Sequence, residues 1–305
     1  MRELSEKFMS DLLESDGLLH PILARVRQDD TLLLAIRENY INIYYRGGNL
    51  LKIREEGKGL YTSFFEENYG ETGPIKKIEN QSDSAKWIKA FPHLKEAMDF
   101  HFFKHRKPER EFQQLIAREN NFSTISNETE YFITDIELAD SNLKARFDML
   151  AILWPASQRK NGSKCRPALI EMKYSDGALG GDSSLLKHLQ DIEKFITNSI
   201  KYKELLNSME NQFNQLQQLG LLNLNQCKNG AKIKLNNDKP EVIFILANHN
   251  PRSSKLNTIL DEPKVLKYSQ SEFFDLKFFV SRFAGYGLHK DCILSLNQFI
   301  NFLKS

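Results

Sequence analysis

The segment from Lys144 to Lys173 constrains the fold more than any other part of the chain. It contains two apolar runs typical of β-strands, separated by a polar, basic loop. The first run carries one carboxylate, Asp148, and the second ends in Glu171-Met-Lys173. Successive side chains of a strand point to opposite faces, so Glu171 and Lys173 share a face. If the two runs pair as a hairpin, Asp148 lies close to both.

This grouping of charges indicates a cation site. Two carboxylates brought together at a sheet are costly to ionise unless a cation lies between them. For any one of these residues, an ordinary salt-bridged sheet edge is the alternative. The same segment holds seven basic and only two acidic residues, although the whole chain has a net charge of only +2. The positive excess around the acids favours a polyanionic ligand.

The composition is that of an ordinary globular protein. A chain of 305 residues with 41% hydrophobic and 27% charged residues can form one large domain or two modest ones. It has no apolar run near the roughly 18 residues of a membrane span, and its start lacks the apolar core of a signal peptide. Cys165, Cys227 and Cys292 show no metal-ligand spacing and predict free thiols. We therefore expect a cytoplasmic protein without a membrane segment.

Residues 1–95 predict a subdomain made of a helix, over residues 2–14, and an antiparallel β-meander. Arg46-Gly-Gly-Asn49 predicts a tight turn between two of the strands, because glycine permits positive φ. A supporting sheet is the favoured interpretation of the meander, and a nucleic-acid platform built from its tyrosines is the alternative. The four strand-like runs are Thr31–Arg37, Tyr40–Arg46, Asn49–Arg54 and Leu60–Phe65.

Helix signals follow the meander. Ser84 begins a predicted helix through Phe91, and Pro92 begins another through about His105. The histidines in this stretch are interpreted as surface residues, because no glutamate-containing zinc signature surrounds them. Proline and early acids favour a further helix from Pro108 that ends at Asn121.

Residues 96–305 predict a mixed α/β domain. From residue 108 onward the expected order is a helix, three strands, a helix, two strands and a helix. This order favours a central mixed β-sheet that contains the hairpin and is flanked by helices. Beyond the hairpin, the expected elements are a helix from Ser183 to about Met209, strands Glu241–Ala247 and Leu276–Phe283, and a helix Ser295–Leu303.

With these residues in view, residues 108–250 resemble the PD-(D/E)XK nuclease superfamily, which includes restriction endonucleases, Holliday-junction resolvases and RecB-type nucleases. Asp148 stands where the family has its first-strand aspartate, and Glu171-Met-Lys173 matches the (D/E)XK triplet. Glu111 stands where many members carry a glutamate on the helix before the sheet. Gln190 stands where RecB-like members carry a glutamine on the helix after the triplet.

The chain also departs from the family pattern. Phe147, not proline, precedes Asp148. The sequence separation between Asp148 and Glu171 implies an inserted loop at 155–167. Glu109 and Glu119 compete with Glu111 as the helix acid. Glu111 is preferred because it lies early in the helix.

The resemblance implies a restriction-endonuclease-like fold and a nuclease dependent on Mg²⁺ or Mn²⁺. Asp148 and Glu171 would be direct ligands, with the Met172 carbonyl as a third and Glu111 bound directly or through water. Lys173 would contact the attacking water or the phosphate, and Gln190 would orient the phosphate or the lysine. The expected contacts to the nucleic-acid backbone are Lys144, Arg146, Arg159, Lys160, Lys164 and Arg166.

The expected substrate is nucleic acid, and DNA is favoured over RNA because it is the commoner substrate of the superfamily. For cutting both strands, the resemblance implies either a homodimer or two active domains. The main alternative is a catalytically inactive nucleic-acid-binding or assembly module of the same fold. A third reading is an α/β domain without a nucleic-acid role, against which the clustered basic residues argue.

Overall fold

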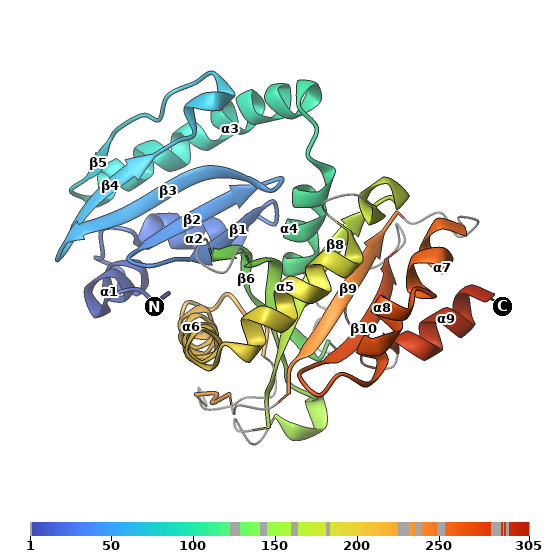
Figure 1. Ribbon diagram of the computed structural model, residues 1–305. Helices are drawn as coiled ribbons and strands as arrows, with labels where there is room; N and C mark the ends of the chain where they lie inside the picture. The colour runs from blue at the N-terminus through green and yellow to red at the C-terminus, as the bar shows by residue number, and fades with distance from the viewer. Residues whose placement is uncertain are drawn as a thin grey trace. The chain divides into compact units, whose positions relative to one another are not determined.

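The structure is a computed structural model. It describes residues 2–122, 129–140, 145–159, 164–180, 184–224, 232–235, 239–248, 254–281, 288, 290 and 293–304. The chain is mixed α/β and contains one antiparallel and one mixed sheet (Figure 1). It divides into two compact units, Met1–Arg118 with Asn211–Asn223, and Glu119–Glu210 with Leu224–Ser305. The boundary predicted after residue 95 falls inside a helix of the first unit.

An antiparallel five-stranded meander forms the sheet of the first unit, with strand order β1-β2-β3-β4-β5. The four predicted strands are confirmed, and a short fifth strand is added. At the tight turn between β2 and β3, Arg46 and Gly47 have φ of 50° and 74°, a conformation that favours glycine. The strands are β1 (Leu32–Ile36), β2 (Tyr40–Tyr45), β3 (Gly48–Gly57), β4 (Leu60–Phe64) and β5 (Lys77–Ile78).

Three helices accompany this sheet: α1 (Glu6–Leu13), α2 (His20–Gln28) and α3 (Gln81–Lys104). The helix expected over residues 2–14 is confirmed as α1. Its N-terminus is capped by Ser5, whose hydroxyl accepts a hydrogen bond from the backbone N–H of Phe8.

The predicted helix break at Pro92 is wrong, because α3 continues through it as one helix. Proline removes one backbone hydrogen bond from a helix interior. Here a continuous buried stripe on one side of α3 offsets that loss, since packing of an apolar face supplies most helical stability in proteins. The stripe consists of Trp87, Phe91, Leu94 and Met98.

Two long helices carry the chain between the units. Helix α4 (Pro108–Asn121) begins at the predicted proline and passes from the first unit into the second at Glu119. Helix α6 (Ser199–Gln218) returns the chain to the first unit at Asn211. In the part of the chain that the structure describes, no helix is both long and apolar enough to cross a membrane.

The second unit contains the mixed six-stranded sheet, in the order β11-β10-β9-β8-β7-β6. Strands β6, β7 and β8 are antiparallel neighbours, whereas β8, β9 and β10 run parallel. The predicted hairpin is confirmed as β7 and β8, which pair from Leu153 with Arg166 to Met149 with Ile170. The strands are β6 (Tyr131–Asp140), β7 (Ala145–Leu153), β8 (Arg166–Tyr174), β9 (Glu241–Ala247), β10 (Asp275–Ser281) and β11 (Leu294–Ser295).

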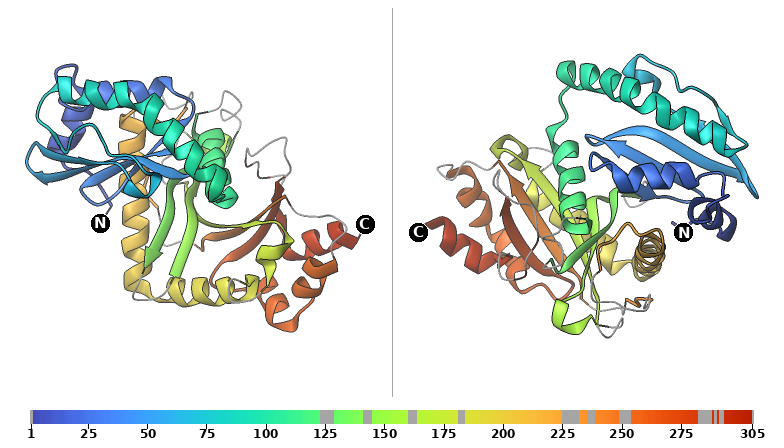
Figure 2. Two further views of the ribbon diagram at one scale, coloured as in Figure 1. Left: turned by 90° about the horizontal axis from the view of Figure 1, so that it is seen from above. Right: turned by 180° about the vertical axis from the view of Figure 1, so that it is seen from behind.

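Helix α5 (Leu185–Thr197) packs on one face of this sheet (Figure 2, left). The centre of its Phe195 ring lies 5.2 Å from that of the Phe147 ring of β7. The single helix predicted from Ser183 is two helices. The chain breaks at Asn198, which has extended backbone and whose side chain accepts from the N–H of Lys201 in α6. Helices α7 (Ser254–Leu260) and α8 (Pro263–Leu266) were not expected, whereas α9 (Leu296–Lys304) was.

Candidate active site

The β7–β8 hairpin places Asp148 beside the triplet, as the strand pattern predicts. The ladder between the strands ends at the pair of Met149 and Ile170. Directly beyond it, Asp148 Oδ2 accepts a hydrogen bond from the backbone N–H of Met172 at 2.8 Å. Asp148, Glu171 and Lys173 are 6%, 1% and 5% exposed. Two acids and one lysine are therefore buried together, which requires mutual compensation or a ligand.

Burial of Asp148 makes its charge costly. Loss of solvation, and then the nearby negative charge of Glu171, raise the pKa of Asp148 to about 7. The Met172 amide and the Lys173 ammonium act in the opposite direction but do not restore the ordinary value. The neutral form of Asp148 is therefore favoured more than in an exposed aspartate. A cation near the pair would favour its ionised form.

His188 on α5 bridges the triplet's two charged side chains. Its Nδ1 lies 3.1 Å from Glu171 Oε2, and its Nε2 lies 2.9 Å from Lys173 Nζ. Because a lysine ammonium can only donate, Nε2 of the ring accepts. The proton of the neutral imidazole then lies on Nδ1 and is donated to Glu171. The ring holds Lys173 and Glu171 in a defined arrangement.

Sequence reasoning selected Gln190 on this helix and missed His188. The signal was available in the helical period, because Leu185, Leu189 and Ile192 form the buried stripe of α5. His188 lies three residues after the first of these and four before the last, and therefore on the sheet-facing side. Gln190 is exposed. The structure does not bring it to the buried acids.

Glu111, the predicted helix acid, is engaged by a different partner. Its two carboxylate oxygens accept from Arg46 Nε at 2.8 Å and from an Arg46 terminal nitrogen at 3.2 Å, and Arg46 also binds Asp99 at 2.8 Å. Glu111 and its competitor Glu109 belong to the first unit, whereas Glu119 belongs to the unit that contains the buried acids. The metal-binding role of Glu111 stays a prediction. The contact that the structure shows is its ion pair with Arg46.

Arg159 requires a correction. The sequence predicts this residue in a polar, basic loop that guides the nucleic-acid backbone, but it is 3% exposed. Its guanidinium donates to the carbonyls of Trp154 and Thr129 and lies 5.1 Å from the Phe132 ring. The side chain fastens the end of β7 to the start of β6 and is not presented to a ligand.

The other predicted basic contacts differ in availability. Arg146 and Lys164 are exposed. Arg166 is tied to the protein, because it donates to the Lys239 carbonyl and pairs with Asp275 at 2.8 Å. Lys144 and Lys160 lie outside the described residues.

The donor set limits which metals the site fits. Within the described ranges, no group of three or more His, Cys, Asp or Glu side chains is placed to hold a metal ion. The buried pair of Asp148 and Glu171 offers two carboxylates. Mg²⁺ commonly binds through one or two carboxylates and keeps several waters, so the pair fits it better than an ion such as Zn²⁺ that needs a full protein cage. The Met172 carbonyl stays a predicted ligand.

Comparisons with protein-family models, with curated proteins and with solved structures gave no match.

Proposed function

We propose that this protein is a metal-dependent nuclease that hydrolyses phosphodiester bonds in DNA. The observation that carries the proposal is the buried group of Asp148, Glu171 and Lys173 at the end of the β7–β8 ladder. The order of α4, three antiparallel strands, two helices and a strand parallel to β8 supports a restriction-endonuclease-like core.

In this proposal Asp148 and Glu171 hold Mg²⁺ or Mn²⁺. When bound, the ion would polarise a water molecule and offset the charge of the scissile phosphate. Lys173 donates to the phosphate or to the attacking water and stabilises developing negative charge. Its ammonium has three hydrogens, and only one is needed for His188, so others remain for the substrate.

His188 acts through Lys173 and is a positioning residue. By accepting from Lys173 and donating to Glu171, it fixes the direction of the ammonium and holds one carboxylate oxygen. Exposed Arg146 and Lys164 are available to contact backbone phosphates, which would position the strand without reading its sequence.

The test is cleavage of labelled single- and double-stranded DNA and RNA, with Mg²⁺ or Mn²⁺ and with EDTA. We compare wild type with Asp148→Asn and Lys173→Ala. The matched control is Asp191→Asn, which removes an acid on α5 that pairs with Lys187. Wild type and the control should cleave DNA, and each site variant should lose about 10²-fold or more, as for other removed charge-stabilising groups.

Equal cleavage by Asp148→Asn would contradict the proposal. Binding without cleavage in either metal would favour the inactive nucleic-acid-binding module instead. Cleavage of RNA with DNA left intact would keep the chemistry and correct the substrate.

A further inference from the structure

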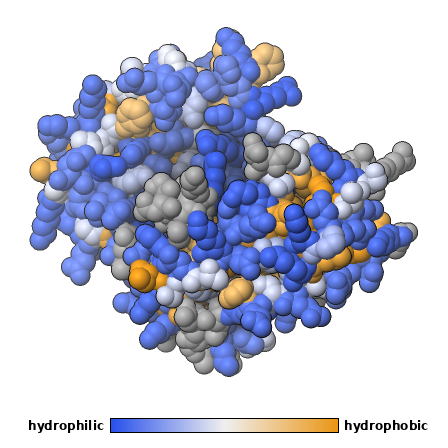
Figure 3. Space-filling model, in the orientation of Figure 1, coloured by the Kyte–Doolittle hydropathy of each residue, from blue (hydrophilic) through white to orange (hydrophobic). Residues whose placement is uncertain are grey.

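The last turns of α3 present two phenylalanine rings to solvent. Phe100 and Phe103 are 66% and 75% exposed, the highest values for phenylalanine among the residues that the structure describes. Three positions apart, they lie on one side of the helix. Apolar surface emerges amid hydrophilic residues at this end of α3 (Figure 3). A single exposed apolar side chain is ordinary, but two exposed rings on one side of a helix suggest a contact surface.

Basic residues surround these rings. Residues 100–107 read Phe-His-Phe-Phe-Lys-His-Arg-Lys and contain no acid. Lys104, Arg106 and Lys107 are exposed, and within the described ranges none of them lies within salt-bridge distance of a carboxylate. The Lys104 ammonium lies 5.0 Å from the centre of the Phe100 ring. Cations at a helix C-terminus complement its dipole, but the dipole does not explain the exposed rings.

The acids near this surface do not cancel its charge. Asp99 is held by Arg46 at 2.8 Å and by the Tyr45 hydroxyl at 3.0 Å. Glu111 is held by the same arginine. Glu96 is exposed one turn before Phe100, and Glu109, two residues after Lys107, is partly buried. The three exposed basic residues outnumber these two acids.

We propose that the aromatic–basic patch, formed by Phe100, Phe103, Lys104, Arg106 and Lys107, binds single-stranded nucleic acid. Unpaired bases stack on the two rings, and the basic side chains neutralise neighbouring phosphates, the combination by which proteins hold single strands without reading sequence. A duplex keeps its bases stacked on one another and cannot use the rings.

A lipid surface fits this patch less well. Interfacial helices bury a broad apolar face that includes aliphatic side chains. Here the exposed apolar surface consists of two rings followed by basic residues, and the rest of the helix's apolar stripe is buried in the first unit. The patch belongs to the first unit and the buried acids to the second, so this inference goes beyond the proposed hydrolysis and does not depend on it.

The experiment measures binding of the full chain to labelled oligothymidylate in EDTA, where metal-dependent cleavage is prevented. Phe100→Ala/Phe103→Ala should weaken binding at least about tenfold, because stacking of each base contributes strongly. The affinity of this double variant for a blunt duplex of equal length should differ from that of wild type by less than about twofold. The matched control is Phe302→Ala, which removes a 54% exposed phenylalanine from α9 and should leave both affinities unchanged.

Two further variants separate the roles of rings and charges. Phe100→Leu/Phe103→Leu keeps apolar side chains but removes the flat rings, and it should also lose affinity. Lys104→Ala/Lys107→Ala should reduce the slope of log affinity against log salt by about 1.4, since each phosphate contact on a single strand contributes about 0.7.

Unchanged oligothymidylate binding by Phe100→Ala/Phe103→Ala would overturn the proposal. Full affinity in the leucine variant would overturn stacking as its basis. Binding to phosphatidylserine vesicles, lost in the alanine variant, together with no binding to oligothymidylate would assign the patch to a membrane surface instead.

Discussion

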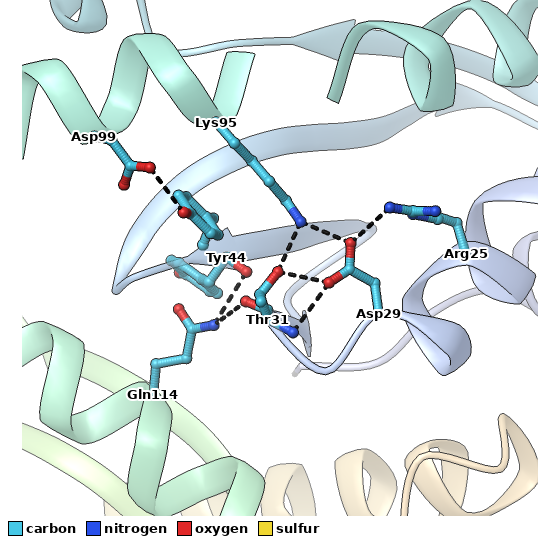
Figure 4. A network of polar contacts seen from close by, with 8 residues as sticks. Arg25, Asp29, Thr31, Tyr44, Lys95, Asp99 and Gln114 are labelled. Atoms are coloured by element: carbon cyan, nitrogen blue, oxygen red, sulfur yellow. Dashed lines mark hydrogen bonds and ion pairs between the residues drawn. The ribbon is translucent and has the colours of Figure 1, made fainter. Parts of the chain in front are cut away.

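Two aspartates, one in each unit, have pKa values that are shifted in opposite directions. Burial alone would raise the pKa of Asp29, but hydrogen bonds from Lys95 and Thr31 lower it to about 2. In Figure 4, Lys95 reaches from α3 to the Asp29 carboxylate, at 2.6 Å, while Arg25 binds it from α2 at 2.9 Å. Asp148 in the second unit has its pKa raised to about 7 instead, chiefly by burial.

The contrast distinguishes a charge that stabilises the fold from one that destabilises it. The network around Asp29 extends through Thr31, because Gln114 of α4 donates to the carbonyls of Thr31 and Tyr44 (Figure 4). These contacts favour the supporting-sheet interpretation of the meander. Asp148 holds its charge at a cost in stability, and titratable groups held in such a state are candidates for function.

The largest expected effect comes from Asp148→Asn, which should lower activity and raise stability together. We expect a loss of about 10²-fold or more in cleavage. Because the folded pKa is raised above its ordinary 3.8, ionising Asp148 destabilises the fold as pH rises from about 4 to about 7. Above pH 7 the asparagine variant should be more stable by about 1–3 kcal/mol, within the upper bound of about 4 kcal/mol from the pKa shift.

Urea unfolding in EDTA at pH 8 and at pH 4 measures this difference. The gain should be present at pH 8 and nearly absent at pH 4. An asparagine variant that is less stable than wild type at pH 8 would make Asp148 a structural residue like Asp29.

His188 should have the next largest effect on activity. His188→Ala should lower cleavage about 10- to 100-fold, in the range found for residues that orient a ligating or catalytic group. His188→Gln should retain more activity, because an amide can accept from Lys173 and donate to Glu171 at the same time. Initial cleavage rates at saturating DNA measure both variants, and equal losses would show that the bridging geometry does not matter.

Asp29→Asn tests the other side of the comparison. Its folded pKa lies below the ordinary 3.8, so the charge stabilises the fold above about pH 4, and this contribution is lost as pH falls toward 2. We expect a destabilisation of about 2 kcal/mol at pH 7 with little change in cleavage. The control is Asp30→Asn, an exposed neighbour. If Asp29→Asn lost cleavage but kept its stability, the structural role assigned to Asp29 would be contradicted.

Glu111→Gln should have the smallest effect. Removing its charge weakens the half-exposed pair with Arg46, at about 0.5–1 kcal/mol. If the role of Glu111 is structural, cleavage should fall less than about threefold, whereas a direct metal ligand should cost far more. Glu119→Gln measured in parallel shows whether the acid in the second unit is the one that matters.

The strands and the buried acids were predictable from the sequence because both depend on local alternation. The period of two placed Glu171 and Lys173 on one face, and the apolar runs fixed the hairpin that carries Asp148. Both predictions depend only on residues that are close in the sequence and on the pairing of β7 with β8.

Features that depend on distant partners were not predictable in the same way. The buried stripe of α3 overrides Pro92, and the site of Arg159 depends on carbonyls of two separate segments. The pairing of Glu111 with Arg46 joins residues far apart in the chain. His188 is different, because helical periodicity already placed it on the buried side of α5.

The most direct test of the account is Mn²⁺ binding followed by electron paramagnetic resonance at pH 8, without nucleic acid. Wild type and Asp191→Asn should each bind one Mn²⁺, and Asp148→Asn should bind at least about tenfold more weakly, as expected when one of two charged ligands is lost. Equal Mn²⁺ binding by Asp148→Asn and wild type would contradict the assignment of the buried pair as a metal site.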